Sequence, residues 1–298
     1  MRILITGAGG FIGRHLVERR AGEHALFALV RRRPATVLPN VVYVEQDLRQ
    51  PLDQRQLPDE LDAIVHQAAL IDPTPGGEAA LFQVNVVATW ELLQYAQASG
   101  VRSFVHASTG GVYGCRNQPF VEEDPFNPMD LYSLTKAQAE LAVRAAPGEF
   151  QRAILRYFFP YGPGTPNPIP RWVQGALTGE PLAVTPNGKP VFNPLHIRDA
   201  VEATVRGLQL TESTTLNIAG NEETTFARIA ELAAAHVGRR PNLVIQQPEA
   251  VIPYYRADLL ADTARMRRVL NFTPTISLAD GIAELAEALL SASRATNP

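Results

Sequence analysis

The sequence has very little cysteine: Cys115 is the single one among 298 residues. One thiol cannot form a disulfide within the chain, which fits a reducing compartment. Long apolar runs are also missing, so we expect no segment that spans a bilayer. The opening residues, Met1–Thr6, are too short to be the apolar region of a signal peptide. We therefore expect a cytoplasmic protein.

An excess of positive charge is missing as well. The formal net charge is −3, with 19% charged and 46% hydrophobic residues. Proteins that bind nucleic acid or anionic membranes are commonly basic, so we expect neither partner. No internal repeat, low-complexity segment or long linker interrupts the chain, and we expect no metal site. The composition indicates a globular protein with one large or two modest cores.

A glycine-rich loop follows the first apolar run. Arg2–Thr6 reads as a buried parallel strand, and Phe11–Arg20 has the periodicity of a helix. A glycine loop between a strand and a helix is the usual cradle of a dinucleotide pyrophosphate, which the amide groups at the helix N-terminus bind. We expect the cofactor to contact this loop and the first helical turn, at Gly7, Gly10, Phe11, Ile12 and Gly13.

The end of the second predicted strand, Ala25–Val30, bears on the choice of cofactor. Dinucleotide sites of this kind often have an acidic residue there, which binds the adenosine ribose. Here the position is Val30, and three arginines follow it. Guanidinium groups bind phosphate, so the sequence favours NADP(H) over NAD(H), with Arg31 and Arg32 as the expected contacts. The alternative is a solvated run of charge.

Two further predicted strands, Val41–Glu45 and Leu61–His66, end near expected cofactor contacts. Asp47 and Leu48 follow the first of them, and Asp47 either meets the adenine or caps a turn. Ala68 follows the second, where a small side chain lets the backbone lie against the cofactor. We expect His66 to hydrogen-bond to its neighbours and not to act as a base.

The candidate catalytic residues are a threonine, a tyrosine and a lysine. Thr109 follows the predicted strand Ser103–Ala107, where a hydroxyl faces the crevice in which such sheets bind ligands. Tyr132 and Lys136 lie one turn apart on a predicted helix. A free tyrosine has a pKa of about 10, and a nearby ammonium lowers it. Such a pair makes a general acid/base for carbonyl–alcohol chemistry.

These motifs occur together in a recognisable order, which continues through Arg156–Gly164 and the region of His196–Asp199. Over essentially its whole length the chain resembles the extended short-chain dehydrogenase/reductase family, the NAD-dependent epimerase/dehydratase group. The resemblance implies an α/β fold, a Rossmann-type doubly wound parallel sheet with a smaller α/β C-terminal substrate domain. We expect the Rossmann domain over 1–160 and the substrate region over 161–298, with 191–220 returning to the Rossmann domain.

The resemblance also assigns roles. It makes Tyr132 the acid/base, while Lys136 lowers the pKa of Tyr132 and holds the nicotinamide ribose. Thr109 orients the substrate hydroxyl or carbonyl, and Asn85 supports this network. The usual substrates of the family are nucleotide-linked sugars.

The chain departs from the family pattern near the substrate. The 4,6-dehydratases carry an Asp-Glu pair where this chain has Gly110 and Gly111, so water elimination is disfavoured. Phe159 replaces an asparagine that lies near the substrate phosphates in the epimerases. A diphosphate-binding arginine is replaced by Val191 or Phe192, and Arg171 or Lys189 are candidates to compensate. The expected substrate contacts are Thr109, Tyr132, Phe159 and Arg171.

Three functions are consistent with these features. The first is an NADPH-dependent reductase or dehydrogenase acting at a secondary alcohol or ketone of a sugar or sugar-like substrate, which the arginine run favours slightly. The second is a redox-neutral nucleotide-sugar epimerase that retains NAD. The third is a dinucleotide-binding protein without catalysis, which has no need of an intact Thr109, Tyr132 and Lys136.

We also expect a two-fold homodimer. The predicted helices Asn85–Ala98 and Asp130–Arg144 carry apolar residues on more than one side, which exceeds what one sheet-facing stripe needs. The apolar positions are Val86, Leu92, Leu93 and Ala96 on the first helix and Leu134, Ala137 and Leu141 on the second.

Overall fold

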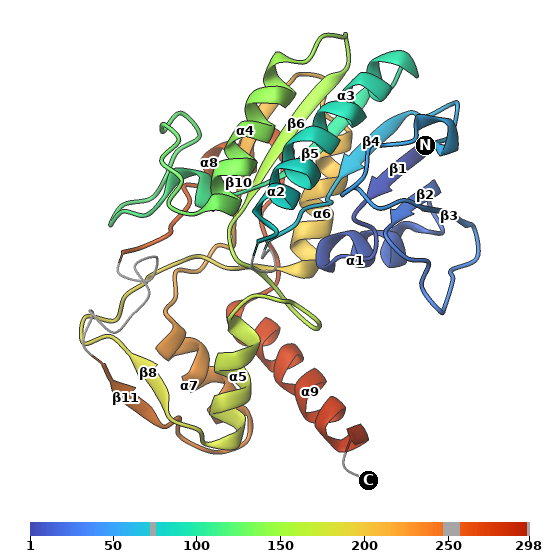
Figure 1. Ribbon diagram of the computed structural model, residues 1–298. Helices are drawn as coiled ribbons and strands as arrows, with labels where there is room; N and C mark the ends of the chain where they lie inside the picture. The colour runs from blue at the N-terminus through green and yellow to red at the C-terminus, as the bar shows by residue number, and fades with distance from the viewer. Residues whose placement is uncertain (72–75, 247–256, 297–298) are drawn as a thin grey trace. The chain divides into compact units, whose positions relative to one another are not determined.

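The computed structural model describes residues 1–71, 76–246 and 257–296 (Figure 1). These residues form two compact units, each with its own apolar core. The first unit comprises 1–113, 125–156 and 201–216. The second comprises 114–124, 157–200 and the described residues from 217 onward.

A seven-stranded sheet is the centre of the first unit. Strand β1 pairs in parallel with β2 and β4, β2 with β3, and β4 with β5. This mostly parallel sheet confirms the predicted Rossmann-type α/β fold. The strands in spatial order are β10 (Thr214–Ile218), β6 (Gln151–Tyr157), β5 (Ser103–Thr109), β4 (Ala63–His66), β1 (Arg2–Thr6), β2 (Ala25–Val30) and β3 (Val41–Glu45).

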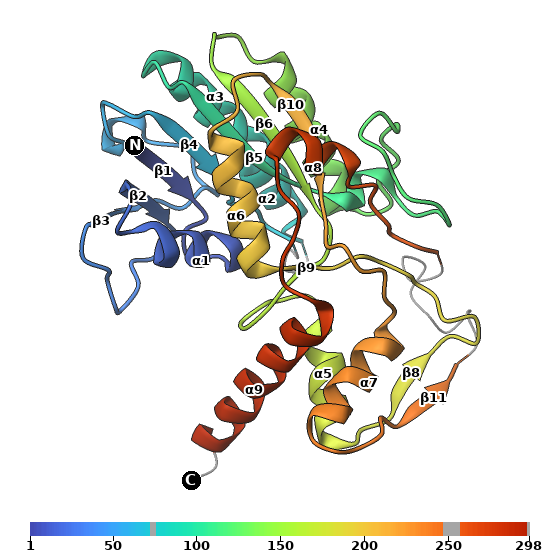
Figure 2. The ribbon, with the colours of Figure 1, turned by 180° about the vertical axis from the view of Figure 1, so that it is seen from behind.

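Helices cover both faces of the sheet, and alternation along β1 shows why. Leu4 belongs to the core beneath α3 (Ala88–Ala98) and α4 (Leu131–Ala145), together with Leu92. Ile3 and Ile5 point to the other face, where they meet side chains of α1 (Phe11–Arg20) and of the second half of α6 (Ile197–Leu208). Figures 1 and 2 show α3 and α4 on the first face and α6 on the second. A strand buried on both faces needs consecutive apolar residues, which Ile3, Leu4 and Ile5 supply in β1.

The helix predicted over Asn85–Ala98 differs in the structure. A short helix α2 (Glu78–Phe82) leads into a π-helical turn, Gln83–Val87, and α3 begins only at Ala88. The π turn contains Asn85, which is completely buried. Turns of this kind are often found at functional sites.

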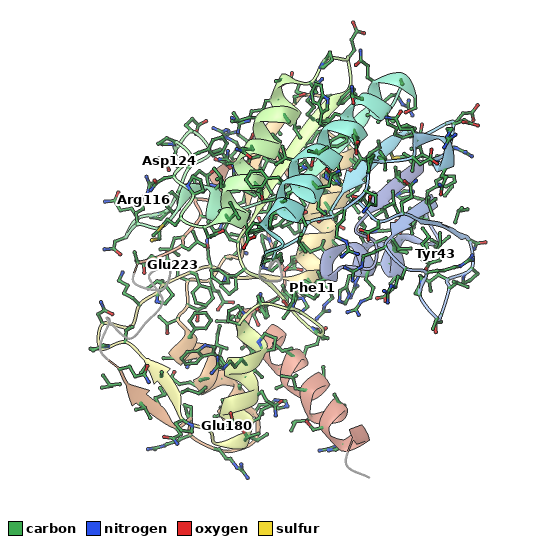
Figure 3. All side chains as sticks on the ribbon, in the orientation of Figure 1. Phe11, Tyr43, Arg116, Asp124, Glu180 and Glu223 are labelled. Carbon is green, nitrogen blue, oxygen red and sulfur yellow. The ribbon has the colours of Figure 1, made fainter. Side chains whose placement is uncertain are left out.

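The second unit is built mainly from three helices, α5 (Ile169–Thr178), α7 (Phe226–His236) and α9 (Leu278–Thr296). Their apolar faces meet in one core. Two small parallel pairs complete it together with α8 (Ala264–Leu270): β8 (Leu182–Val184) with β11 (Leu243–Ile245), and β7 (Pro160–Tyr161) with β9 (Leu195–His196). Segment 114–124 belongs to this unit, and its Arg116 pairs with Asp124 over 2.5 Å (Figure 3).

Candidate active site

A cleft of about 400 Å³ opens in the first unit beside the glycine loop. Of the predicted cofactor contacts, seven line it: Gly7, Gly10, Arg31, Arg32, Asp47, Leu48 and Ala68. The cleft is also lined by residues that sequence reasoning does not single out, among them Gly9, Gln46, Arg49, Leu70 and Val84. These residue types do not by themselves indicate a binding site. The residues come together only because the fold brings the ends of several strands and the loops after them to one place.

The glycine loop has the shape that a pyrophosphate requires. Gly7 has a φ of +65°, and a Cβ there would lie 2.6 Å from the backbone nitrogen of Ala68. A Cβ on Gly13 would lie 2.2 Å from the Gly7 carbonyl oxygen. Helix α1 has no side-chain cap and no acidic residue in its first turn. Its free amide groups and dipole are therefore available to an anion, so the loop fits a dinucleotide.

Phe11 and Ile12 lie in the first turn of α1 and are half-buried (Figure 3 labels Phe11). Gly13 is buried and packs on the loop itself. The contact of these three residues with a cofactor stays a prediction.

Carboxylates stand beside the arginine run at the adenosine end of the cleft. Arg49 binds both oxygens of Asp47, with its Nη2 2.5 Å from Oδ2 and its Nε 3.0 Å from Oδ1. These hydrogen bonds hold the pKa of the Asp47 carboxyl below its usual range, and the charge of Arg31 adds to the effect. On β3, Glu45 accepts a hydrogen bond from the backbone nitrogen of Arg33 over 3.1 Å. The arginines therefore do not form an unopposed basic pocket.

The first unit brings the three predicted catalytic residues onto β5 and α4. Asp130 caps α4 by accepting hydrogen bonds from the backbone nitrogen and the hydroxyl of Ser133, over 2.7 and 2.9 Å. Tyr132 is half-buried in the first turn, and Lys136, one turn later, is only 1% exposed. Thr109 ends β5, and its Oγ1 accepts a hydrogen bond from the backbone nitrogen of Gly111 over 3.1 Å.

The electrostatics of Tyr132 differ from the expectation. Its pKa lies above the usual range because burial disfavours the phenolate and the nearby Asp130 charge does so further. Burial also lowers the pKa of Lys136 to about 8, against the opposing effect of Glu140. The predicted lowering of the tyrosine pKa by Lys136 is therefore not seen in the protein alone. Burial shifts the pKa values of both groups toward their uncharged forms.

Asn85 connects the end of β4 with α4. Its Oδ1 accepts a hydrogen bond from Leu70 N over 2.8 Å, and its Nδ2 donates to Leu70 O and to Thr135 Oγ1, each over 2.9 Å. Thr135 precedes Lys136, and Leu70 lines the cleft. The π turn thus places one buried amide where it connects the lining of the glycine-loop cleft with α4.

His66 is a satisfied core residue, as expected from the sequence. Thr89 Oγ1 donates to Asn85 O over 2.7 Å, so it must accept from Nε2 of His66, 2.8 Å away. The other nitrogen of the neutral ring, Nδ1, then has no proton and accepts from Thr6 Oγ1 over 2.6 Å, while Thr6 Oγ1 itself accepts from Ala68 N. These directions fix the neutral tautomer with the proton on Nε2. Burial, together with the charge of Lys136, lowers the pKa of His66 to about 3.

Comparison with known proteins identifies the family. The model of the NAD-dependent epimerase/dehydratase family matches residues 3–219, well over half of the chain. The chain belongs to the NAD-dependent epimerase/dehydratase family. It is thus an enzyme of the short-chain dehydrogenase/reductase type, as the motifs predict, and the residues of the site described above lie within the matched range.

Individual members of the epimerase/dehydratase family match over nearly the full length. An uncharacterized UDP-glucose epimerase, YtcB of Bacillus subtilis, is 27% identical over 95% of this chain and 96% of its own. MoeE5, solved in complex with UDP-glucuronic acid and NAD, is 30% identical with a TM-score of 0.85, over 98% of this chain and 100% of its own. The UDP-glucuronic acid 4-epimerase of Bacillus cereus, 22% identical over 98% of this chain and 100% of its own, shares the fold with a TM-score of 0.87.

These relatives favour the epimerase alternative over the NADPH-dependent reductase that the arginine run suggests. MoeE5 and the Bacillus cereus epimerase were both solved with NAD, so the preference for NADP(H) finds no support in them. Two carboxylates lie beside the arginine run: Glu45, at the end of β3, binds the backbone nitrogen of Arg33, and Asp47, two residues further on, is close enough to Arg31 for the arginine charge to lower its pKa.

The two remaining predicted substrate contacts lie in the second unit. Phe159 has a φ of +40°, and its ring centroid lies 4.6 Å from that of Phe192 and 6.4 Å from that of Phe226. Arg171 is exposed on α5. Their contact with substrate stays a prediction.

The described residues offer neither a metal site nor a membrane-spanning helix. Within 1–71, 76–246 and 257–296, no group of His, Cys, Asp and Glu side chains is arranged to hold a metal ion. Within the same ranges, no helix combines the length and apolar character that crossing a membrane requires.

Proposed function

We propose that the protein is an NAD-dependent epimerase that inverts a hydroxyl-bearing carbon, C4, of a UDP-linked hexose or hexuronic acid. The observation that carries the proposal is the occurrence of Thr109, Tyr132 and Lys136 in one unit with a glycine-lined dinucleotide cleft. Support comes from the 30% identity, over nearly the whole chain, to MoeE5, which was solved with NAD and UDP-glucuronic acid.

Bound NAD would supply the reversible acceptor for the hydride of the sugar carbon. The residues of the chain then have to move one proton. Tyr132 takes the proton of the sugar hydroxyl as the carbonyl forms and gives it back when the alcohol is restored. Thr109 holds the same oxygen through its hydroxyl. Because burial raises the pKa of Tyr132, its phenolate depends on nearby positive charge, which Lys136 provides.

Dehydration is a poorer candidate for this site. It needs a second acid/base pair, and the positions after Thr109 are Gly110 and Gly111, both buried in a 3₁₀ turn. No carboxylate can reach the sugar from these positions. Epimerisation needs one acid/base and a reversible hydride acceptor, which the residues of the first unit can supply and hold.

The adenosine end of the cleft supports NAD as the cofactor. Asp47 stays ionised because Arg49 binds it at both oxygens. A 2′-phosphate beside this carboxylate would be repelled by its charge, whereas an unmodified ribose carries no charge. We propose that Arg31 and Arg32, which line the same end, balance the charge of the pyrophosphate and the acidic residues.

We propose a two-fold homodimer as the assembly.

We propose Phe159 and Arg171 as substrate contacts. Phe159 holds a left-handed backbone conformation that is unfavourable for a bulky residue. Its ring packs with Phe192 and Phe226, so this position offers an apolar surface to a substrate. Arg171, exposed on the helix that follows, is available for a phosphate.

The test is to incubate the purified protein with UDP-glucose and, separately, with UDP-glucuronic acid and a trace of NAD. Proton NMR of the sugar should show the C4 epimer accumulating to equilibrium, with no net NADH in the absorbance at 340 nm. The same protein should not consume NADPH with the corresponding keto sugar. Consumption of NADPH without an epimer would overturn the proposal in favour of a reductase.

A further inference from the structure

Helix α4 is attached to strand β5 by two polar contacts in matching register. His106 and Ser108 are two residues apart on β5 and so point to the same face. Lys136 and Glu140 are four residues apart on α4. Lys136 Nζ lies 3.3 Å from His106 Nε2, and Ser108 Oγ donates to Glu140 Oε1 over 2.5 Å. Two strand residues and one helical turn span nearly the same length, about 6 to 7 Å, so the contacts reinforce each other.

Lys136 depends on this arrangement because its ammonium is almost completely buried, with 1% exposure. Among the described residues, the hydrogen-bond partner of Lys136 Nζ is His106. The titratable groups around the pair are His66 of β4, whose ring lies 5.3 Å from that of His106, and Tyr132 and Glu140 of α4. Glu140 is itself engaged by Arg156 of β6 over 2.7 Å, so its charge is shared with another cation.

An ammonium has no lone pair and can only donate, so His106 must present an unprotonated Nε2 to it. The proton of the neutral ring is then on Nδ1. In the described part of the chain, Nδ1 of His106 is buried without a hydrogen-bond partner. A buried N–H without a partner is unfavourable. The His106 ring therefore accepts a hydrogen bond from Lys136 at Nε2, while its own Nδ1 is left without a partner. Core packing alone does not require this arrangement.

Resting on the proposed function, we propose that His106 is a positioning residue of the reaction, whose Nε2 keeps the Lys136 ammonium charged and fixed one helical turn from Tyr132. Burial favours the uncharged form of Lys136, whereas a hydrogen bond to a neutral imidazole acceptor stabilises the ammonium. Removing the acceptor should make Lys136 lose its proton at lower pH. The phenolate of Tyr132 then loses its nearby positive charge within the pH range where the enzyme works.

The sequence offers an unusually direct measurement, because Lys136 and Lys189 are its only two lysines. Protein labelled with ¹³C at the lysine ε-carbon gives two NMR resonances, which Lys189→Arg assigns. Burial places the pKa of Lys136 at about 8, so its resonance should titrate near that pH in the parent. Lys189 lies in the second unit, and its curve should be the same in every variant.

Two variants of His106 distinguish the effect of its hydrogen-bond acceptor from the effect of its ring size. His106→Phe keeps a ring of similar size without an acceptor, and His106→Gln places an amide oxygen near the position of Nε2. The Lys136 midpoint should fall by about one pH unit or more in His106→Phe and stay within about half a unit in His106→Gln. Should His106→Phe not fold, His106→Asn, whose amide stops near the position of Nδ1, takes its place with the same expectation. An unchanged midpoint in the variant without an acceptor would overturn the inference.

Kinetics supply a second readout with UDP-glucuronic acid and NAD. The alkaline limb of kcat should move to lower pH in His106→Phe and return in His106→Gln, with little change in KM. A parent protein without turnover, combined with the predicted NMR shift, would overturn the proposed function and leave the assignment of the lysine partner intact. Turnover with an unmoved midpoint would overturn this inference alone.

Discussion

The Asn85 side chain donates a hydrogen bond to Thr135 Oγ1 over 2.9 Å and exchanges two more with the backbone of Leu70. The bond to Thr135 is buried and those to Leu70 are part-buried, and together they join the π turn to α4 and to the segment that lines the glycine-loop cleft. One amide group therefore connects α4 with the lining of the cleft.

Replacing this amide should destabilise the fold. In Asn85→Ala the Leu70 amide and carbonyl groups and the Thr135 hydroxyl lose a partner, so we expect the free energy of unfolding to fall by about 1 to 3 kcal/mol. Urea unfolding followed by circular dichroism measures it. Gln94→Ala, on the exposed side of α3, is the control and should change it by less than about 0.5 kcal/mol. Equal effects of the two substitutions would show that the amide is dispensable.

Tyr132→Phe removes the proposed acid/base and leaves the ring. We expect kcat for the UDP-sugar to fall by about 10² to 10⁴, because no other group would carry the proton, while the Kd for NAD changes little. Tyr43→Phe, on β3, makes the same substitution away from the catalytic helix and should leave turnover intact (Figure 3). Unchanged turnover in Tyr132→Phe would exclude the assigned role.

The buried pair of Arg156 and Glu140 should contribute strongly to stability. Arg156 is 1% exposed and binds both oxygens of Glu140, over 2.9 and 2.7 Å. Arg156→Met leaves the carboxylate buried with fewer partners, so we expect a loss of about 3 to 5 kcal/mol in the free energy of unfolding.

Arg144 provides a matched control for this prediction. It binds the same Glu140 over 3.1 Å, but its side chain is 44% exposed. Arg144→Met should therefore cost no more than about 1 kcal/mol. If both arginines cost the same, burial is not what makes the Arg156 contact important.

His66 should make stability depend on pH in the acid range. Its pKa is lowered to about 3 in the folded protein, whereas an unfolded chain titrates histidine near 6.5. Between these values only the unfolded chain binds the proton, so the free energy of unfolding rises with pH. The stabilisation is complete above about pH 6.5 and is lost as the pH falls toward 3.

A substitution isolates this contribution. His66→Gln cannot take up the proton, so the change in the free energy of unfolding between pH 4.5 and pH 7 should be about 2 to 3 kcal/mol smaller than in the parent. Urea unfolding at the two pH values gives the difference. Parallel pH dependence in both proteins would rule out His66 as the titrating group.

The homodimer prediction keeps Leu134 and Leu141 of the residues that the sequence indicates and needs others in place of the buried ones. Leu92, Leu93, Ala96 and Ala137 are buried in the core of the first unit, because these helices pack on each other and on the sheet. The exposed apolar residues of the two helices and the π turn are Val87, Trp90, Leu134 and Leu141, with exposures of 38 to 53%.

Charge on this surface should prevent association. We expect the parent to have the mass of a dimer in light scattering at micromolar concentration, and Leu141→Glu combined with Trp90→Glu to have the mass of a monomer. Val42→Glu, at an exposed apolar position on β3, is the control and should remain a dimer. A parent protein with the mass of a monomer would contradict the homodimer prediction.

Much of the sheet could be predicted because its strands are short apolar runs that end at turn residues. The bounds of β1, α1, β2 and β3 agree with those expected from the sequence. The pairs β8–β11 and β7–β9 have no such signal, since strands of two or three residues form only through tertiary pairing. The sequence also does not predict the π turn at Asn85, because the contacts of Asn85 are with Leu70 and Thr135, which are distant in the sequence.

The site divides in the same way. Glycine spacing and the Tyr132–Lys136 pair indicate a dinucleotide enzyme, because both follow from local geometry. The carboxylates beside the arginine run could not be placed from the local sequence, since Glu45 and Asp47 come 12 or more residues later and reach Arg33 and Arg31 only through the pairing of β2 with β3. The contact of His106 with Lys136 joins residues 30 positions apart, and no local pattern reveals it.

The central claim, a hydride removed and returned within one active site, is tested most directly with an isotope. UDP-glucuronic acid carrying deuterium at C4 is incubated with the protein and a trace of unlabelled NAD, and the sugar is analysed by NMR and mass spectrometry. We predict that the C4 epimer forms with the deuterium still on C4, because Tyr132 moves only the hydroxyl proton. Loss of the deuterium to solvent or to the free cofactor pool, or the absence of the epimer, would contradict the account.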